Sequence, residues 1–323
     1  MKPDFYISLD SFKEFLYNDL DKDGIFKLKM KDKIRGFYMK TVIISLNSKY
    51  IHSSLAPWYL KSYCGESEGT IGIMEFSIND NPDGVLAAVY NQKPNVAAFS
   101  CYIWNISYVL KIVENLKKVL PHVKIVLGGP EVSFDAEQII SNNPAVDYII
   151  MGEGEKSFKQ LLCAIKSEES CNKRIEGLVY REGNEILSNK EYVLIKELDT
   201  IPSPYTEKML SSLKNRIVYF ESSRGCPFSC SYCLSSTFEG VRYFSMQRVR
   251  EDLKKLIGAR VRQVKFVDRT FNCNRQRAKE ILKFIIDNAM GTYTNFHFEV
   301  AADLFDDEML SILKEAPAGL IQF

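Results

Sequence analysis

Between Lys40 and about residue 166, short apolar runs alternate with stretches of helical periodicity, and this alternation is the strongest constraint on the fold. The runs of strand length lie at 42–46, 71–76, 96–100, 124–127 and 148–151. Continuous apolar strands separated by helices are typical of a parallel sheet that is covered on both faces. Right-handed crossovers then predict an α/β, doubly wound sheet, whose ligands bind beyond the carboxyl ends of the strands.

A second series of β/α units follows. Strand-like runs lie at 217–220, 263–267, 296–300 and 319–323, with helical stretches between them. Repeating β/α units are typical of a barrel with its active site at the carboxyl ends of the strands. The 98 residues from Cys226 to Phe323 are far fewer than the roughly 250 of a full eightfold barrel. We therefore expect a partial barrel that looks truncated.

A length of 323 residues suggests about two domains. A hairpin-like pattern at 173–188 is followed by Pro202 and Pro204, which stiffen a linker and prevent a helix. We predict four segments: an N-terminal extension at 1–38 with one amphipathic helix, a first domain at 39–170, a hairpin and linker at 171–210, and a second domain at 211–323.

Three cysteines follow the run at 217–220 with the spacing C-x3-C-x2-C: Cys226, Cys230 and Cys233. Gly225 and Pro227 flank the first of them and favour a tight turn. Clustered thiols in a chain without a secretory signal point to metal or redox chemistry before disulfides. A zinc site would need a fourth ligand, for which Cys273 and His297 are the nearby candidates. Three thiolates alone suit a [4Fe-4S] cluster with one open iron, because most clusters take four cysteines.

With Tyr232 directly before Cys233, this loop resembles the signature of the radical S-adenosylmethionine (SAM) enzymes. The resemblance implies that the three cysteines hold a [4Fe-4S] cluster whose open iron chelates S-adenosyl-L-methionine. In that family, an electron from the cluster breaks a sulfur–carbon bond and yields a 5′-deoxyadenosyl radical. The resemblance also implies SAM-binding roles for Tyr232, Asp268 and Glu299. The alternative for Asp268 and Glu299 is a cap or a salt bridge.

Glycine-rich loops follow the strands of the first domain. Gly128-Gly129-Pro130-Glu131 follows the fourth strand, Gly152-Glu153-Gly154-Glu155 follows the fifth, and the turn at 100–105 follows the third. Glycine lets the backbone approach a ligand closely. The first turn has no G-x-G-x-x-G pattern, which disfavours a dinucleotide site.

Together with the cysteine loop, these turns resemble the cobalamin-binding domain of one large subclass of radical SAM enzymes. The alternative is a flavodoxin-like domain with an empty or structural crevice. His52 lies where related cobalamin domains supply a histidine to cobalt, but Tyr50 and Leu55 replace two residues of that motif. We therefore expect cobalt without this histidine. The resemblance implies cobalamin contacts from Ser100, Tyr102, Gly128, Gly129, Glu131, Gly152, Glu153 and Gly154.

The resemblance implies a cobalamin-dependent radical SAM enzyme that transfers a methyl group to an unactivated carbon of a small-molecule substrate. A reduced flavodoxin or ferredoxin is the expected electron donor. Radical cyclisation or rearrangement is the alternative within the subclass. A catalytically decayed corrinoid or iron–sulfur binding module is the alternative outside it, and the short barrel leaves the activity of this exact chain open.

Charge and hydropathy exclude some partners. A net charge of +1 argues against a dominant surface for nucleic acid. No run approaches the roughly 18 apolar residues of a membrane span, and charged residues at positions 4–14 disfavour an export signal. We expect a cytoplasmic protein with no nucleic-acid or membrane partner.

Overall fold

The chain folds around two sheets whose strands run mainly parallel. A computed structural model describes residues 39–65, 68–167, 172–189, 194–213, 215–237 and 240–323, and residues 40–323 form one compact unit. The predicted extension at 1–38 lies outside the described residues. No helix within the described ranges combines the length and the apolar character needed to cross a bilayer.

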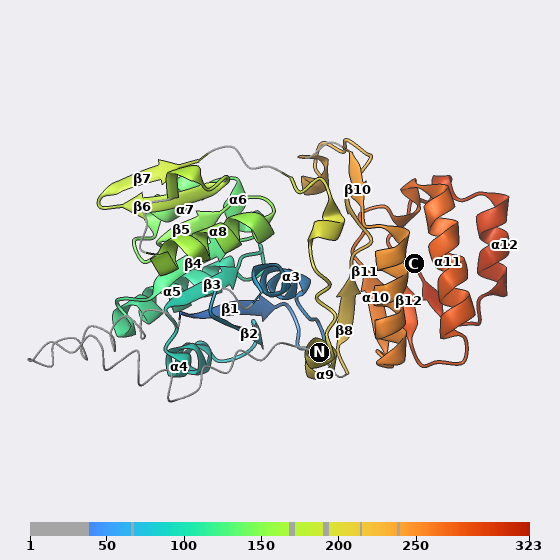
Figure 1. Ribbon diagram of the computed structural model, residues 1–323, viewed down its shortest axis with the longest axis horizontal. Coiled ribbons are helices and arrows are strands. Elements are labelled where there is room, and N and C mark those ends of the chain that lie inside the picture. Colours follow the sequence, from blue (N-terminus) through green and yellow to red (C-terminus); the bar gives the residue numbers. More distant parts are fainter. Residues whose placement is uncertain (1–38, 66–67, 168–171, 190–193, 214, 238–239) are drawn as a thin grey trace, which may run out of the picture. The chain divides into compact units, whose positions relative to one another are not determined.

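The first sheet has the strand order β2-β1-β3-β4-β5-β6-β7 (Figure 1). Its first five strands are parallel, with a topological switch point between β1 and β3, where ligands of such sheets bind. The predicted doubly wound sheet is confirmed. The strands are β1 (Lys40–Asn47), β2 (Thr70–Ser77), β3 (Val96–Ser100), β4 (Lys124–Gly128), β5 (Tyr148–Ile150), β6 (Leu178–Glu182) and β7 (Glu185–Ser188).

Helices cover both faces of this sheet, because each has one apolar stripe. In α5, for example, the four buried residues recur at the spacing of a helix: Val109, Ile112, Val113 and Leu116. Helices α3 and α8 pack together, as do α4 and α5 (Figure 1). The helices are α3 (Leu55–Cys64), α4 (Pro82–Gln92), α5 (Ile106–Val119), α6 (Pro130–Ser133), α7 (Ala136–Asn142) and α8 (Gly154–Ser167), with the 3₁₀ turn η1 (Asn172–Arg174) after α8.

The hairpin predicted within the linker belongs to the first sheet. Strand β6 pairs antiparallel with β5, and β7 pairs antiparallel with β6. Val179 and Tyr180 are buried, so the hairpin extends the core of the first domain. Its short, partly polar strands concealed this pairing in the sequence, since nothing in the local pattern indicates which edge accepts them. The other predicted domain boundaries remain a prediction.

The second sheet has four parallel strands in the order β13-β12-β11-β8, which confirms the predicted partial barrel. Strand β12 is shorter than predicted and ends at His297, so Glu299 lies in the loop beyond it. The strands are β8 (Ile217–Phe220), β11 (Gln263–Phe266), β12 (Asn295–His297) and β13 (Ile321–Gln322). The helices are α9 (Glu207–Ser212), α10 (Met246–Gly258), α11 (Arg275–Ala289) and α12 (Asp307–Glu315), and the 3₁₀ turns are η2 (Leu198–Thr200), η3 (Leu234–Thr237), η4 (Phe271–Cys273) and η5 (Ala302–Leu304).

The two faces of the second sheet differ because successive side chains of a strand point to opposite sides. The face toward the helices is fully buried and apolar, with Val218, Phe220, Val264, Phe266 and Phe296. The other face is partly exposed and mostly polar, with Tyr219, Gln263, Lys265, Asn295 and His297. Such a polar inner face is suited to line a ligand cavity.

A short antiparallel ribbon lies between the second sheet and the loops of the first, and the sequence did not predict it. Strand β9 (Ser223–Gly225) pairs with β10 (Val241–Tyr243), with Arg224 directly opposite Arg242. Gly225 has φ 101°, and a Cβ atom there would collide with the carbonyl oxygen of Gly240. Only glycine fits this close approach of the two strands directly before Cys226.

Helix α3 joins the two sheets. Its residues Trp58 and Tyr59 are buried within the hydrophobic core of the second sheet, and Tyr59 stacks on Phe244 at 6.2 Å between ring centroids. An ion pair of 2.8 Å between Arg216 and Glu75, both nearly buried, adds a second connection. These contacts link the two sheets within this unit.

We predict that Trp58→Ala lowers the free energy of unfolding by about 3–5 kcal/mol, because it leaves a cavity in the shared core. Urea denaturation followed by circular dichroism measures the loss. The control is Tyr90→Ala on α4, whose side chain is 40% exposed and which should change stability by no more than about 0.5 kcal/mol. Equal effects of the two changes would contradict the proposed role of α3.

Candidate functional site

A slot of about 130 Å³ opens beside the carboxyl ends of β3, β4 and β5. Apolar residues of α3 and of the strands form its walls, among them Pro57, Leu60 and Ala98. Six of the eight predicted cobalamin-binding residues line it: Ser100, Tyr102, Gly128, Gly129, Gly152 and Gly154. The other two, Glu131 and Glu153, do not.

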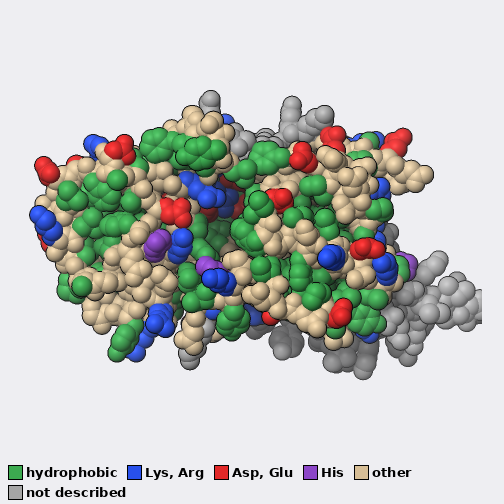
Figure 2. Space-filling model, turned by 180° about the vertical axis from the view of Figure 1, so that it is seen from behind, with side chains coloured by type: hydrophobic (Ala, Val, Ile, Leu, Met, Phe, Trp, Pro, Cys, Tyr) green, Lys and Arg blue, Asp and Glu red, His purple; other side chains and the backbone are tan. Residues whose placement is uncertain are grey.

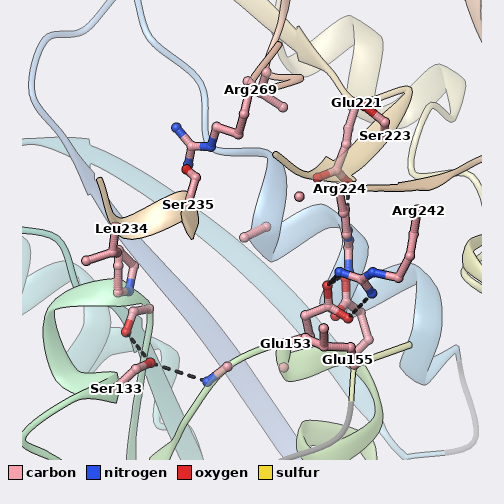
Figure 3. A pocket seen from close by; sticks show the side chains of 18 of the residues that line it. Ser133, Glu153, Glu155, Glu221, Ser223, Arg224, Leu234, Ser235, Arg242 and Arg269 are labelled. Atoms are coloured by element: carbon pink, nitrogen blue, oxygen red, sulfur yellow. Dashed lines mark hydrogen bonds and ion pairs between the residues drawn. The ribbon is translucent and has the colours of Figure 1, made fainter. Parts of the chain in front are cut away.

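The loops around the slot are held close together. Gly129 has φ 114°, and a Cβ atom there would lie 2.5 Å from the carbonyl oxygen of Cys101, so only glycine fits. Ser133 Oγ donates to the carbonyl oxygen of Gly129 at 2.8 Å and accepts from the backbone N–H of Gly152 at 3.3 Å (Figure 3). The turns after β4 and β5 therefore present mainly backbone to a ligand.

Two larger cavities continue from this slot toward the second sheet. One of about 410 Å³ is lined by Gly129, Gly152 and Glu153 of the first sheet and by Arg224 and Gly225 of the ribbon. Another of about 590 Å³ is lined by residues at the carboxyl ends of β1, β8 and β11. Figure 2 shows a hollow with basic, acidic and histidine side chains beside it. Tyr102 lines all three spaces and stacks on Trp104 at 4.5 Å.

The cysteine loop flanks the 410 Å³ cavity. Gly225 and Leu234, the residues next to its two ends, line that cavity. Cys226 and Cys233 are partly exposed, and Cys230 is exposed. Within the described ranges, no three His, Cys, Asp or Glu side chains converge on a point that could hold a metal ion. The three thiols thus share one short, accessible loop beside this cavity.

The two candidates for a fourth zinc ligand, Cys273 and His297, do not join the three cysteines in any such group of described residues. The Cys273 Sγ lies 3.4 Å from the hydroxyl of Tyr243. The His297 side chain belongs to the inner face of β12, where burial and the nearby Lys265 lower its pKa. Three thiolates as the donor set of an iron–sulfur cluster stay a prediction.

Asp268, a predicted SAM contact, is buried at the end of β11. Its carboxylate accepts from the backbone N–H of Ser222 at 3.1 Å and from the hydroxyl groups of Ser222 and Ser223. Burial raises its pKa, and the serine hydrogen bonds act in the opposite direction. The arrangement matches the alternative of a structural cap, because it fixes the chain between β8 and the ribbon.

The other two predicted SAM contacts are accessible. Tyr232 is 91% exposed on the cysteine loop. Glu299 lines the 590 Å³ cavity and pairs with Lys265 at 3.4 Å. Arg269 extends from the end of β11, lines both larger cavities and has no hydrogen-bond or ion-pair partner among the described residues.

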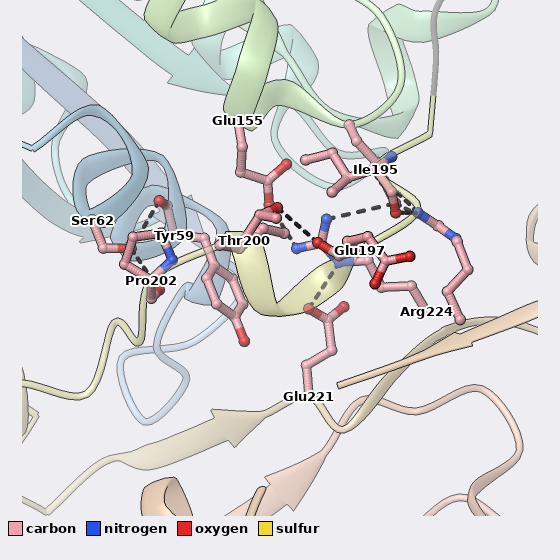
Figure 4. Close-up of polar contacts among 12 residues, drawn as sticks. Tyr59, Ser62, Glu155, Ile195, Glu197, Thr200, Pro202, Glu221 and Arg224 are labelled. Atoms are coloured by element: carbon pink, nitrogen blue, oxygen red, sulfur yellow. Dashed lines mark hydrogen bonds and ion pairs between the residues drawn. The ribbon is translucent and has the colours of Figure 1, made fainter. Parts of the chain in front are cut away.

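A charged cluster connects the loop after β5 with the ribbon. Arg224 contacts Glu155 at 2.6 Å and Glu221 at 3.0 Å (Figure 4). Arg242 contacts both carboxylate oxygens of Glu153, at 2.6 and 3.0 Å (Figure 3). All five side chains are at most 19% exposed. The predicted cobalamin residue Glu153 thus directs its carboxylate to the second domain.

Burial and neighbouring charges shift the pKa values of the charged groups in this cluster in different ways. Burial would lower the pKa of Arg224, but the charges of Glu221, Glu155 and Glu153 outweigh it and raise that pKa. Burial raises the pKa of Glu221 to about 7, although Arg224 acts against it. Burial would also raise the pKa of Glu153, and the hydrogen bond from Arg242 lowers it instead.

His52 contacts the second domain. Its Nδ1 lies 2.7 Å from the hydroxyl of Tyr219 on β8, and its backbone bridges to Ile217. Burial and the charges of Lys265, Lys49 and Arg216 lower its pKa. This contact agrees with the expectation that His52 packs at the loop and is not a ligand of cobalt.

Sequence reasoning missed several residues of the site, including Arg224, Arg242, Glu221 and Arg269. The residue types alone gave no signal, because charged residues are common at strand ends. The pairing of β9 with β10 is what brings the two arginines together, and this register is not readable from two runs of three residues.

Known proteins resemble the chain in both halves. Residues 41–162 match the family model of the B12 binding domain, and residues 220–323 match that of the Radical SAM superfamily. The cobalamin-dependent radical SAM methyltransferase TokK of Streptomyces tokunonensis is 28% identical over 233 residues, which cover 67% of this chain and 33% of that protein. An uncharacterized methyltransferase of Pyrococcus horikoshii is 30% identical over 235 residues, covering 71% and 50%.

A solved structure agrees with this similarity at the level of the fold. The cobalamin-dependent S-adenosylmethionine radical enzyme OxsB, with aqua-cobalamin and S-adenosylmethionine bound, superposes with a TM-score of 0.69. The identity is 18%, and the match covers 87% of this chain and 42% of that one. The chain spans between a third and a half of the length of the two curated relatives named above.

We predict that Glu221 gives stability a pH dependence. Its pKa of about 7 in the folded state exceeds the ordinary 4.5, so the folded chain binds more protons between these values. The stabilisation is present below the ordinary pKa and is lost as the pH rises through about 7. Urea denaturation from about pH 5 to pH 8 should therefore show a steeper loss for the wild type than for Glu221→Gln. Parallel profiles would contradict the assignment.

Proposed function

We propose that this chain, which matches the B12 binding domain at residues 41–162 and the Radical SAM superfamily at residues 220–323, acts in radical methyl transfer to an unactivated carbon of a small-molecule substrate. It would do so with cobalamin, a [4Fe-4S] cluster and S-adenosyl-L-methionine. One observation carries the proposal: the glycine-lined slot of the first sheet and the cysteine loop of the second adjoin the same cavity. A group in the slot and a group on the loop would therefore meet a common substrate.

When bound, the cluster supplies the electron that cleaves S-adenosyl-L-methionine, and cobalamin carries the methyl group. For the cobalamin, we propose the turns at 100–105, 128–131 and 152–155 as the contact surface. The slot, of about 130 Å³, suits a flat, apolar part of such a ligand, and Gly128, Gly129, Gly152 and Gly154 allow the ligand to approach the backbone. We propose that Glu153 acts by positioning its loop, because Arg242 occupies its carboxylate.

For the cluster, we propose Cys226, Cys230 and Cys233 as ligands. The buried Asp268 holds the serines that precede the first of them, and Gly225 allows the ribbon to close just before it. The start of the loop is thus fixed, and its remainder is accessible. This accessibility also suits contact with an electron donor, for which we propose a reduced flavodoxin or ferredoxin.

For S-adenosyl-L-methionine, we propose Tyr232 and Glu299 as direct contacts and Asp268 as a residue that acts through Ser222 and Ser223. Tyr219, Lys265 and Glu299 on the inner side of the second sheet would bind polar groups of the ligands. Closure of the cavities between the two sheets would exclude water from the reaction. We propose the cytoplasm as the compartment, because clustered thiols persist in reducing surroundings; no nucleic-acid partner is proposed.

The first test is reconstitution of the purified chain with iron and sulfide without oxygen. We predict an iron–sulfur absorbance band with about four irons per chain, and release of 5′-deoxyadenosine when S-adenosyl-L-methionine and a reductant are added. Cys230→Ala should lose the cluster. Cys273→Ala, a cysteine outside the loop, should keep it. A cluster without 5′-deoxyadenosine would favour the decayed binding module instead, and a tetrahedral zinc ion in its place would refute the proposal.

The second test fills the slot. Ala56 on α3 lines the slot and is exposed, so Ala56→Trp places a large ring at the entrance without disturbing the core. We predict at least tenfold weaker binding of hydroxocobalamin, measured by absorbance titration, because the ring occupies the volume that the ligand needs. Ala87→Trp, at an exposed position of α4, is the matched control and should bind as the wild type does. Equal affinities of the two variants for hydroxocobalamin would show that the slot is not part of the cobalamin-binding site.

A further inference from the structure

The ribbon that leads into the cysteine loop carries an electrostatic conflict. Arg224 and Arg242 are directly opposite on two strands of three residues each, and both side chains are largely buried. Like charges opposite one another destabilise a strand pair, and a two-stranded ribbon is marginal even without such a pair. The ribbon therefore needs carboxylates from elsewhere to hold its shape.

Two of the three carboxylates that resolve this conflict come from the first domain. Glu153 accepts two hydrogen bonds from Arg242, and Glu155 accepts one from Arg224 at 2.6 Å. Glu153 belongs to the loop after β5, and Glu155 to the first turn of α8, which follows that loop directly. Glu221, at the end of β8, supplies the third carboxylate. Glu153 also accepts from the backbone N–H of Ile195 in the linker, so the linker is held to the same point.

The segment after β5 that supplies the two glutamates is also a wall of the slot. Gly152 and Gly154, which alternate with the glutamates, both line it. At the other end, Arg224 lies two residues before Cys226, and Gly225 is the only residue between them. A ligand in the slot would thus be linked to Cys226 by a series of contacts: the segment after β5, the two ion pairs of its glutamates, and strand β9.

We propose that Glu153 and Glu155, acting through Arg242 and Arg224, couple the slot to the cysteine loop. Binding of a ligand in the slot then increases the affinity of the loop for the cluster, and the cluster increases the affinity of the slot for its ligand. The inference rests on the proposed function, since it requires that the chain bind both groups. A ligand that restricts Gly152 and Gly154 fixes Glu153 between them and Glu155 directly after them, and fixed glutamates order the ribbon. The coupling is reciprocal, as binding equilibria require. Glu153, Arg224 and Arg242 lie outside the slot and are positioning residues, whereas Glu155 also lines the slot.

The test measures the dissociation constant of hydroxocobalamin for the full chain without oxygen, before and after reconstitution with iron and sulfide. We expect the wild type to bind about tenfold more tightly once it holds the cluster, within the usual range of coupling between sites. The reverse measurement is the rate at which an iron chelator strips the cluster, which hydroxocobalamin should slow in the wild type. In Glu155→Gln, both groups should still bind, but the ratio of dissociation constants should approach one.

Glu75→Gln is the matched control. Glu75 also forms a nearly buried ion pair between the two sheets, with Arg216, but this pair does not involve the ribbon. The Glu75→Gln variant should keep the tenfold ratio of dissociation constants. Arg242→Lys keeps the charge and loses the bidentate contact with Glu153, so we expect an intermediate ratio of dissociation constants. This variant also tests the coupling if Glu155→Gln fails to fold.

Two results would overturn the inference while leaving the proposed function standing. One is a wild-type chain that binds both groups with a ratio of one. The other is a loss of coupling in Glu75→Gln as large as that in Glu155→Gln or Arg242→Lys, which would indicate general loosening of the junction. A wild-type chain that binds neither hydroxocobalamin nor a cluster would instead overturn the proposed function itself.

Discussion

The insertion of Trp58 and Tyr59 of α3 into the core of the second sheet is the contact on which the arrangement of the site depends. A helix that covers one sheet normally buries its apolar stripe against that sheet alone. Here the same helix lines the slot with Pro57 and Leu60 and anchors the neighbouring sheet with its aromatic residues. Movement of one sheet relative to the other would expose two large aromatic side chains, which is costly in water.

The buried charges at the junction complement this apolar contact. An ion pair that leaves water loses hydration, so it stabilises little by itself and becomes strongly destabilising when one partner is removed. Such pairs select one geometry, because Arg224 and Arg242 meet Glu155 and Glu153 only where the segment after β5 meets the ribbon. Apolar burial thus stabilises the contact between the two sheets, and the ion pairs select their relative orientation.

The sequence was sufficient to predict most of the fold, because the apolar runs of parallel strands are distinctive. It also located the slot, since turn-forming glycines after successive strands must lie at one edge of the sheet. It failed where pairing is non-local: the hairpin of β6 and β7 extends the first sheet, and β9 pairs with β10 across 15 intervening residues. Asp268 lies beyond the end of a strand, where the sequence placed it, but its serine partners depend on the path of the chain between β8 and β9.

The alternation of side chains in the second sheet has a consequence for how such a protein changes over time. Val218, Phe220, Val264, Phe266 and Phe296 maintain the packing, while Tyr219, Lys265 and His297, on the same strands, point to the opposite side. Substitutions in the second group alter the chemistry of the cavity wall and leave the helices undisturbed. Evolution can therefore retune what this scaffold accepts, one residue at a time, without first finding compensating mutations in its core.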